Sequence, residues 1–325
     1  MSDDVVSVIL GASRITAICH ENPDADTLGA ALAVRIVAER LGKQGEVVTA
    51  DPPPPMFAFL PRINEVRSTP GLEPDVAVVL DGPLHRTGAI ASEQAAWLKR
   101  ARLVNIDHHV SNPGEGVAFL VDPEAAATCE VVALLLPDLG VPLDAELATV
   151  LLAGIVGDTR TFSHPNATPR TLRVAADLVA AGAPLSAINR ALYVDKPYAT
   201  LALWGRMLGT MAQRCDGRIV HADMTLEMLA EFDTEASASE GFIDLLGSTR
   251  TADITVLFKE AEPDTTRVSI RTTPRADAVA ITSSFGGGGH ARAAGCSVDA
   301  SLAVARERVL AECERELARG DAGGR

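Results

Sequence analysis

Short apolar runs alternate with longer helical patterns in the first half of the chain, and this alternation restricts the fold more than any other feature of the sequence. The clearest run is Val76–Leu80, with the sequence VAVVL, and it ends at Asp81. Runs of this kind are typical of buried strands, and strands separated by helices form a mainly parallel sheet. Further strands are predicted at residues 15–19, 46–49 and 103–106, and a helix at about residues 27–41. The first half is therefore predicted to be α/β, with helices on both faces of the sheet.

The middle of the chain, from about residue 125 to residue 212, has an almost wholly helical pattern, and strand patterns return after Cys215. Helices are predicted at residues 127–136, 144–156, 169–182, 184–193 and 196–213. Later strands are predicted at 218–222, 253–258 and 267–271, before a glycine-rich turn and a helix at 302–318. We therefore expect an N-terminal domain over residues 1–185, linker helices over 186–214 and a smaller C-terminal α/β domain over 215–325.

The composition limits the class of protein and its partners. With 325 residues, of which 47% are hydrophobic and 22% charged, the chain has enough apolar material for two folded domains. Its formal net charge of −14 disfavours binding to long duplex nucleic acid, and it suggests that cations lie among some of the carboxylates. The five scattered cysteines, without a C-x-x-C pair, indicate reduced thiols in a cytoplasmic protein. Because no basic region precedes an apolar run at the N-terminus and all apolar runs are short, we predict no signal peptide and no membrane span.

Four clusters of acidic or histidine residues lie at predicted strand ends or helix ends. The first contains His20, Asp24 and Asp26, which follow the first strand within one turn. Hard divalent cations such as Mn²⁺ and Mg²⁺ prefer carboxylates, and imidazole shifts the preference towards Mn²⁺. Taken alone, the cluster is equally consistent with Asp24 and Asp26 capping the helix that follows.

The other clusters are Asp81, the triplet Asp107-His108-His109, and Asp158 within Gly154–Thr159. Asp81 and the Asp107 triplet follow apolar strands, where open α/β sheets bind their ligands, although an aspartate before glycine is also common in turns. Asp158 follows an apolar helix, and the small residues around it allow close approach to another element. Together the clusters supply six candidate ligands for two metal ions about 3.5–4 Å apart, an arrangement that clamps the oxygens of an in-line phosphoryl displacement.

In this order, the clusters resemble the four motifs of the DHH phosphoesterase superfamily. The segment Gly286–Gly295, with the sequence GGGGHARAAG, resembles the glycine-rich motif of the DHHA1 domain that accompanies one branch of the superfamily. The motifs span residues 20 to 295, and the length and two-domain layout are most similar to the nanoRNase/pAp phosphatase group. That group degrades very short oligoribonucleotides and removes the 3′-phosphate from 3′,5′-bisphosphoadenosine (pAp). Some relatives also cleave cyclic di-AMP or its linear product pApA.

The resemblance implies a role for each residue of the N-terminal clusters. One metal ion would be bound by His20, Asp24 and Asp81, and the other by Asp26, Asp81, His108 and Asp158, with Asp81 bridging. Asp107 would orient His108, and His109 would hydrogen-bond the scissile phosphate and stabilise its developing charge. The cofactors would be two divalent ions, most simply Mn²⁺, with Mg²⁺ as the alternative.

In the C-terminal domain the resemblance implies a substrate-binding role. The residues concerned are Gly287, Gly288, Gly289, His290, Arg250 and Arg271. Backbone N–H groups of the glycines can approach a phosphate closely because no Cβ intervenes, and the histidine can donate to the same phosphate. A flexible linker is the alternative interpretation of the glycines, but the apolar helix and apolar strand that flank them disfavour it.

These features predict a manganese-dependent phosphoesterase that hydrolyses pAp or short oligoribonucleotides through attack by a metal-activated water. Cyclic di-AMP or pApA phosphodiesterase activity is the alternative within the family, and a non-catalytic nucleotide sensor is the alternative of another class. A sensor would have lost ligands, and none of the six is missing. A scaffold protein would not place three of its seven histidines in these clusters. The Ser-Arg-Lys-Lys segment of type II inorganic pyrophosphatases is not found in this sequence, which disfavours that activity. Separately, the family resemblance implies a homodimer.

Overall fold

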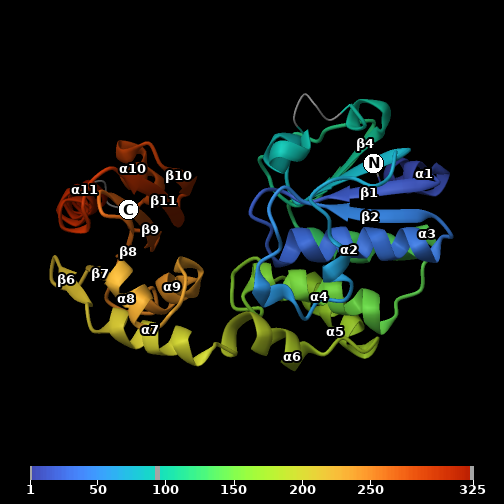
Figure 1. Ribbon diagram of the computed structural model, residues 1–325. Coiled ribbons are helices and arrows are strands. Elements are labelled where there is room, and N and C mark those ends of the chain that lie inside the picture. The colour runs from blue at the N-terminus through green and yellow to red at the C-terminus, as the bar shows by residue number, and fades with distance from the viewer. Residues whose placement is uncertain (1, 92–95, 323–325) are drawn as a thin grey trace. The chain divides into compact units, whose positions relative to one another are not determined.

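The computed structural model describes residues 2–91 and 96–322, and the chain divides into two compact units, Met1–Asp195 and Lys196–Arg325. Each unit has its own β-sheet, its own helices and its own hydrophobic core (Figure 1). The predicted α/β class is confirmed for both.

The N-terminal unit is built on a five-stranded sheet in the order β2-β1-β3-β4-β5, and all neighbouring strands are parallel. The strands are β1 (Arg14–Ile18), β2 (Gln44–Val48), β3 (Val76–Leu80), β4 (Arg102–Asp107) and β5 (Ala118–Val121). All five residues of the central β3 are buried, and they alternate between two separate hydrophobic clusters on the two faces of the sheet. The predicted parallel sheet is confirmed, while the short edge strand β5 was not predicted.

Among residues 2–91 and 96–195, α-helices cover one face of this sheet (Figure 1). They are α1 (Ser2–Gly11), α2 (Ala25–Arg40) and α3 (Thr128–Leu139), with α4 (Ala145–Thr159), α5 (Pro169–Ala180) and α6 (Leu185–Asn189) further from the sheet. On the other face, Val48 and Ala77 pack with Ile90 of the 3-10 segment Leu84–Ala91. The expectation of helices on both faces is therefore corrected: short 3-10 turns cover the second face, because the connection between β3 and β4 contains no long amphipathic run.

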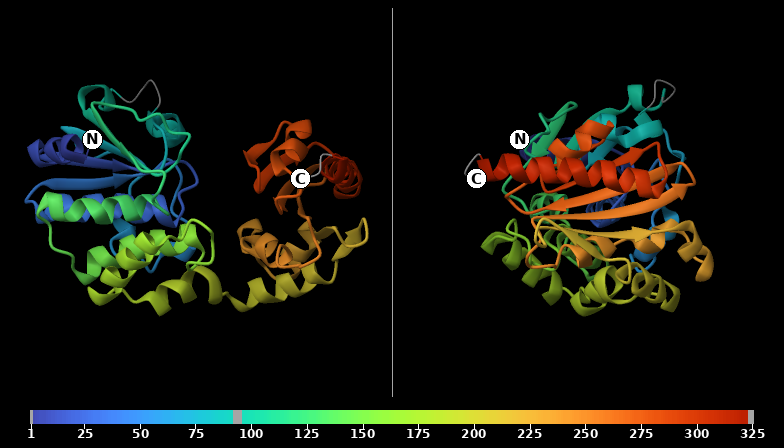
Figure 2. Two further views of the ribbon diagram at one scale, coloured as in Figure 1. Left: turned by 180° about the vertical axis from the view of Figure 1, so that it is seen from behind. Right: turned by 90° about the vertical axis from the view of Figure 1, so that its left-hand side faces the viewer.

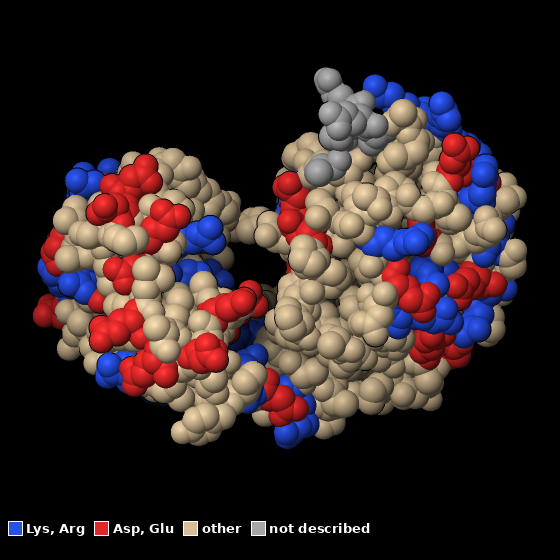
Figure 3. Space-filling view, in the orientation of Figure 1, with Lys and Arg blue, Asp and Glu red and all other residues tan. Residues whose placement is uncertain are grey.

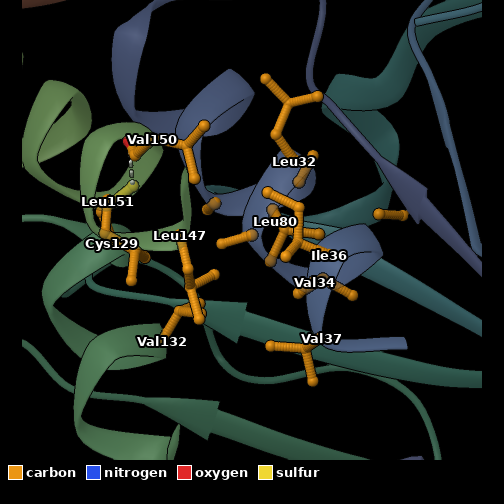
Figure 4. Packing of buried hydrophobic residues seen from close by; sticks show 14 of the residues in the cluster. Leu32, Val34, Ile36, Val37, Leu80, Cys129, Val132, Leu147, Val150 and Leu151 are labelled. Atoms are coloured by element: carbon orange, nitrogen blue, oxygen red, sulfur yellow. Dashed lines mark hydrogen bonds between the residues drawn. The ribbon is translucent and has the colours of Figure 1, made fainter. Parts of the chain in front are cut away.

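Helix α2 is buried nearly all round, because it lies between the sheet and α4. Leu32 of α2 and Leu147 of α4 belong to the shared core, whose packing is shown in Figure 4. A Cβ atom added to Gly154 of α4 would lie 2.3 Å from Sγ of Cys129 and 2.6 Å from Oδ1 of Asp26. The close approach predicted for the small residues of this segment is confirmed.

Helix α5 and the segment that follows it expose several apolar side chains. Leu172 and Val179 of α5 are 50% and 41% exposed, and Val194, in the π-helical turn Arg190–Val194, is 52% exposed. Across residues 2–91 and 96–322, no single helix is long and apolar enough to cross a membrane. The pair Pro169–Ala180 and Leu185–Val194 has that length and composition only when taken together, and its halves are bent by 114°.

The C-terminal unit has a six-stranded sheet in the order β10-β11-β9-β8-β7-β6. Only β7 and β8 are parallel, and the other neighbours are antiparallel. The strands are β6 (Ala212–Arg214), β7 (Ile219–Met224), β8 (Ile254–Glu262), β9 (Thr265–Thr272), β10 (Gly288–His290) and β11 (Ala293–Val298). The three predicted strands correspond to β7, β8 and β9, and the other three were not predicted.

Helices pack on both faces of this second sheet. One face contacts α7 (Tyr198–Leu208), α8 (Leu226–Glu231) and α9 (Phe242–Leu246), and the other contacts α10 (Ala278–Thr282) and α11 (Leu302–Ala322). The right-hand view of Figure 2 shows α11 lying across the strands. The long helix predicted at 196–213 is corrected: α7 ends at Leu208, the hydroxyl of Thr210 donates to the carbonyl oxygen of Met207 at 2.7 Å, and the chain then enters β6.

The glycine-rich segment forms part of a hairpin, because β10 pairs with β11. A Cβ atom on Gly287 would lie 2.3 Å from the carbonyl oxygen of Gly295, and one on Gly289 would lie 2.5 Å from that of Ala293. Gly289 also has a φ of 143°, which few other residues adopt. These two glycines are therefore required by the close packing of the hairpin, and the linker interpretation is excluded.

Gly154→Ala should destabilise the protein by about 1–3 kcal/mol, because its Cβ would overpack the contact between α2 and α4. The matched control is Gly205→Ala in α7, where a Cβ meets nothing within 4 Å. There alanine should stabilise by about 0.4–1 kcal/mol, since it restricts the unfolded chain. Urea unfolding of both variants in EDTA measures the difference. Equal stabilities would contradict the close contact at Gly154.

Candidate metal centre

The predicted ligands lie at the edge of the N-terminal sheet where β1, β3 and β4 end. Parallel strands bring their carboxyl ends to one edge, so the residues that follow them meet there. His20 lies just beyond β1, Asp81 follows β3 directly, and Asp107 is the last residue of β4. Asp81 has a φ of 61°, in the left-handed region that aspartate tolerates better than most residues. Helix α2 begins at this edge and α4 ends there, which adds the aspartates of both helices.

The first group of candidate ligands is His20, Asp24 and Asp81. Nε2 of His20 lies 3.7 Å from Oδ2 of Asp24 and 3.4 Å from Oδ2 of Asp81. The other ring nitrogen, Nδ1, lies 2.6 Å from the carbonyl oxygen of Glu21 and donates to it. This hydrogen bond selects the tautomer that leaves Nε2 available to a metal ion.

The second group is Asp26, His108 and Asp158. Nε2 of His108 lies 3.2 Å from Oδ2 of Asp158 and 4.0 Å from Oδ2 of Asp26. Its Nδ1 lies 3.3 Å from the carbonyl oxygen of Ala125 and donates to it. Nε2 is buried and, in the described part of the chain, makes no hydrogen bond of good geometry. A buried nitrogen without a hydrogen bond, facing carboxylates, suits a divalent cation, so the residues fit the predicted metal site.

Asp81 joins the two groups, because its two carboxylate oxygens face different histidines. Oδ2 faces His20, whereas Oδ1 lies 3.5 Å from Nε2 of His108. The hydroxyl of Thr128 donates to Oδ1 at 3.0 Å and helps to hold this orientation. Asp81 is only 2% exposed. A buried carboxylate arranged in this way is suited to bridge two ions.

Asp107 contacts the ring of His109 and not the ring of His108, so its predicted role in orienting His108 is corrected. Oδ1 of Asp107 accepts from Nδ1 of His109 at 2.8 Å, and it also accepts the backbone N–H groups of both histidines. Asn112 donates to Oδ2 at 2.6 Å. Because the ring of His108 turns towards Ala125, Asp107 hydrogen-bonds only the ring of His109 among the described residues, although a ring nitrogen of His108 lies within 4.8 Å of its carboxylate.

Asp24 and Asp26 accept hydrogen bonds from the starts of two different helices, so only Asp24 caps the helix that follows it. Oδ1 of Asp24 accepts the backbone N–H groups of Asp26 and Thr27, both at 3.0 Å, so Asp24 does cap α2. The carboxylate of Asp26 accepts the backbone N–H groups of Thr128 and Cys129, at 2.6 and 2.9 Å, at the start of α3. Asp26 therefore binds the N-terminus of a different helix. Each aspartate keeps an oxygen within its group of candidate ligands.

One short turn, residues 125–129, contacts three of the six candidate ligands, and the sequence analysis did not identify it. Its carbonyl, amide and hydroxyl groups bind His108, Asp26 and Asp81. The turn is held by the fully buried Glu130, whose carboxylate accepts the N–H of Ala126 at 2.9 Å. Arg170 of α5 donates to the same carboxylate at 2.6 Å. The only signal in the sequence is one acidic residue within the apolar run TCEVVALLL.

Burial and mutual repulsion dominate the electrostatics of the cluster. Burial raises the pKa of Asp26 well above its usual value, and the charges of Asp81 and Asp158 raise it further. Burial lowers the pKa of His20, but the neighbouring carboxylates outweigh burial and raise the pKa to about 10. Burial also lowers the pKa of His108, and again the carboxylates around it reverse the direction. The raised pKa values of the two histidines favour their protonated forms beside these carboxylates.

The residues predicted to bind substrate in the C-terminal unit are only partly brought together. His290 on β10 and Arg271 on β9 both pair with Ala293 of β11, one from each side. His290 is exposed, and Nε of Arg271 donates to Asp244 at 3.2 Å. Gly287 directly precedes β10, and Gly288 and Gly289 are its first two residues. Arg250 lies before β8, outside this row, and among the described residues it forms no ion pair.

Two domains of known families account for most of the chain. Residues 14–155 match the DHH family, N-terminal domain, and residues 216–318 match the DHHA1 domain. The chain belongs to the DHH family of phosphoesterases, in its nanoRNase/pAp phosphatase group. The crystal structure of an exopolyphosphatase-related protein from Bacteroides fragilis has the same fold, with a TM-score of 0.87 at 22% identity over 98% of this chain and 95% of that one.

The individual relatives fall into two kinds. The bifunctional oligoribonuclease and PAP phosphatase NrnA of Thermus thermophilus is 35% identical over 303 residues, which cover 92% of this chain and 89% of that protein. The protein of the same name from Bacillus subtilis is 26% identical, over 97% of this chain and 98% of that protein. The cyclic-di-AMP phosphodiesterase PdeA of Listeria monocytogenes is 25% identical over 98% of this chain but only 48% of its own length.

Binding of Mn²⁺ at pH 7 should release about two protons or more, because both candidate histidine ligands have raised pKa values and must lose a proton from Nε2 to bind a metal. The raised pKa of Asp26 adds to this release. Protons compete with the metal below these raised pKa values, so affinity should rise as the pH increases from 6 to 8. Calorimetric titration in two buffers with different protonation enthalpies measures the release. Heats that do not depend on the buffer would contradict the protonated state of the two rings.

Proposed function

We propose that this chain is a metal-dependent phosphoesterase that hydrolyses short oligoribonucleotides and pAp. One observation carries the proposal: Asp81 presents one carboxylate oxygen to each of two histidine-containing groups, which together form a donor set for two neighbouring cations. The similarity to the NrnA protein of Thermus thermophilus, over nearly the full length of both chains, supports the same substrates. In this proposal one ion is bound by His20, Asp24 and Asp81, and the other by Asp26, Asp81, His108 and Asp158.

The donor atoms favour Mn²⁺ over Mg²⁺, because each group contains an imidazole nitrogen beside its carboxylates. Two such ions would supply an activated water at neutral pH and would neutralise charge on the reacting phosphate. Asp24 and Asp26 keep their positions through backbone hydrogen bonds, so the site is held in place by the fold around it.

His109 is suited to donate a hydrogen bond to the scissile phosphate. The hydrogen bond from Nδ1 to Asp107 raises the pKa of His109 and outweighs the effect of burial. A protonated ring held at Nδ1 presents its second N–H at Nε2, and the side chain is 31% exposed. Donation from Nε2 to a non-bridging phosphate oxygen would stabilise the charge that develops there. Asp107 acts through His109, as a positioning residue.

In the C-terminal unit, we propose that the glycine hairpin binds a second phosphate of the substrate. The backbone of Gly288 is open, because a Cβ there would meet nothing within 4 Å. His290 and Arg271 lie in one row across β10, β11 and β9, and both are hydrogen-bond donors to phosphate. Arg250 is kept as a further candidate for substrate binding.

Cyclic di-AMP or pApA phosphodiesterase activity is the second candidate function. It is supported by the Listeria monocytogenes relative, a cyclic-di-AMP phosphodiesterase that matches nearly all of this chain. The match to NrnA proteins is stronger, and it extends over nearly the whole of those proteins. Relative rates of hydrolysis of pAp, pApA and cyclic di-AMP decide between the two.

We also propose that the protein is a cytoplasmic homodimer. All five cysteines are free, in keeping with a reducing compartment. The exposed apolar side chains of α5, including Leu172 and Val179, offer a surface for self-association. Sedimentation velocity with Leu172→Gln tests this part of the proposal, and a monomeric wild-type protein would refute it.

Asp81→Asn should lower Mn²⁺-dependent hydrolysis of pAp and pApA by at least about a thousandfold, because it removes one of the two anionic oxygens that the ions would share. Asparagine tolerates the left-handed backbone at this position, so the fold should be retained. Asp177→Asn, on the exposed side of α5, is the matched control and should keep wild-type activity.

Phosphate and nucleotide release, measured with Mn²⁺ and with EDTA, gives the result. Near-normal turnover of Asp81→Asn would refute the shared ligand. A wild-type protein that binds two Mn²⁺ ions but hydrolyses none of these substrates would favour the nucleotide sensor.

A further inference from the structure

A row of cationic side chains lies on the face of the C-terminal sheet opposite α11. Arg267 and Arg271 are on β9, and Lys259 of β8 stands directly opposite Arg267 in the strand register. The alternate β9 residues Val268 and Ile270 are buried in the core with α11, so strand alternation places both arginines on the other face.

Two of these cations form no ion pair with a described residue. In the part of the chain that the structure describes, neither Lys259 nor Arg267 forms a hydrogen bond or an ion pair, whereas Arg271 is held by Asp244 at 3.2 Å. Burial lowers the pKa of Lys259, and the neighbouring arginines lower it further against the opposing charge of Glu240. Like charges directly opposite each other on neighbouring strands destabilise a sheet. The requirements of folding do not explain this pair.

Many other basic side chains of the protein, unlike Lys259 and Arg267, are paired with carboxylates. The chain has a formal net charge of −14, and many of its other arginines are paired with carboxylates. Figure 3 shows acidic and basic side chains interleaved over the end of α2 and the start of α4, where Arg40 and Arg62 form ion pairs with Glu146. Lys259 and Arg267 lack such balance, although carboxylates are abundant in this chain.

The surroundings of the pair indicate the chemistry of a ligand. On β11, the small residue Ser297 lies opposite Arg267, which is exposed, and Gly295 lies opposite Ser269. Lys259 is half-buried between Arg267 and Met224 of β7. Phe258 is the only aromatic residue of β8, β9 and β11, all of which are described, and it is buried in the core with α11. A base therefore has no ring of these strands on which to stack. Recognition would depend on anionic groups of the ligand.

We propose that Lys259 and Arg267 form a phosphate subsite for the backbone of a single-stranded oligoribonucleotide, beyond the phosphate that Arg271 contacts. The inference rests on the proposed function and deepens it. Arg267 and Arg271 are four residues apart, which is about 14 Å along an extended strand. That span exceeds the separation of the two phosphates carried by the single ribose of pAp. The subsite thus serves substrates of several nucleotides and leaves pAp unaffected.

The experiment compares the wild-type protein with Lys259→Gln/Arg267→Gln. Fluorescence anisotropy in EDTA measures binding of 3′-fluorescein-labelled oligoribonucleotides of two and five nucleotides over a series of salt concentrations. The variant should bind the pentanucleotide about tenfold more weakly, and the logarithmic salt dependence of its affinity should be shallower by about 1.4, since two phosphate contacts are lost. Its affinity for the dinucleotide should change by less than about twofold.

The control removes the same amount of charge from the opposite face. Arg308 and Arg319 are exposed on α11, and Arg308→Gln/Arg319→Gln should leave both affinities and the salt dependence unchanged. Thermal unfolding checks that the variants are folded. The Lys259→Gln/Arg267→Gln protein should be at least as stable as the wild type, because it lacks the opposed like charges.

The outcomes separate this inference from the proposed function. Equal weakening for both lengths, no weakening, or a wild-type protein that does not bind the pentanucleotide more tightly than the dinucleotide would each overturn the subsite. Length-dependent binding in a wild-type protein that shows no Mn²⁺-dependent hydrolysis would refute the proposed function and leave the subsite supported.

Discussion

The arrangement of the candidate metal centre depends on the contact between Asp26 and the first turn of α3. Asp26 belongs to α2, and its fully buried carboxylate accepts the backbone N–H groups of Thr128 and Cys129. Free N–H groups at a helix N-terminus stabilise a carboxylate, so this contact joins the starts of two helices above the end of the sheet. The same turn then contacts Asp81 and His108. The contact between Asp26 and Thr128, which are 102 residues apart in sequence, thereby helps to set the relative positions of three candidate ligands.

Both domains place like charges close together, although such charges repel each other. In the N-terminal unit, buried aspartates crowd around two histidines. In the C-terminal unit, lysine and arginine stand opposite each other on neighbouring strands. Such arrangements lower the stability of the free protein, and binding of an oppositely charged ligand removes the repulsion. The distribution of charge therefore fits the proposed cations in one domain and the proposed anion in the other, whereas the net charge of −14 suggests only the cations.

The sequence predicted the site best where a buried apolar strand ends at a candidate ligand. The run VAVVL fixed the position of β3 and hence of Asp81, and the residues after β1 and β4 were found in the same way. It was uninformative where a side chain acts through a backbone group far away. The carbonyl oxygen of Ala125, which orients His108, has no signature of its own, and the contact of Asp107 with His109 depends on side-chain directions within a turn. The strands β6 and β10 have only three residues each and lack the apolar alternation on which strand prediction depends.

The link from Arg170 through Glu130 to the turn at 125–129 connects the candidate metal centre to α5, a helix on the outside of the unit. Arg170 is partly exposed, and its partner Glu130 is not a candidate ligand. Two family members with identical ligands can therefore differ in the geometry of the centre if they differ at this pair. Substitutions in the outer helix α5 can therefore alter the site. A comparison of relatives restricted to the candidate metal ligands would not detect them.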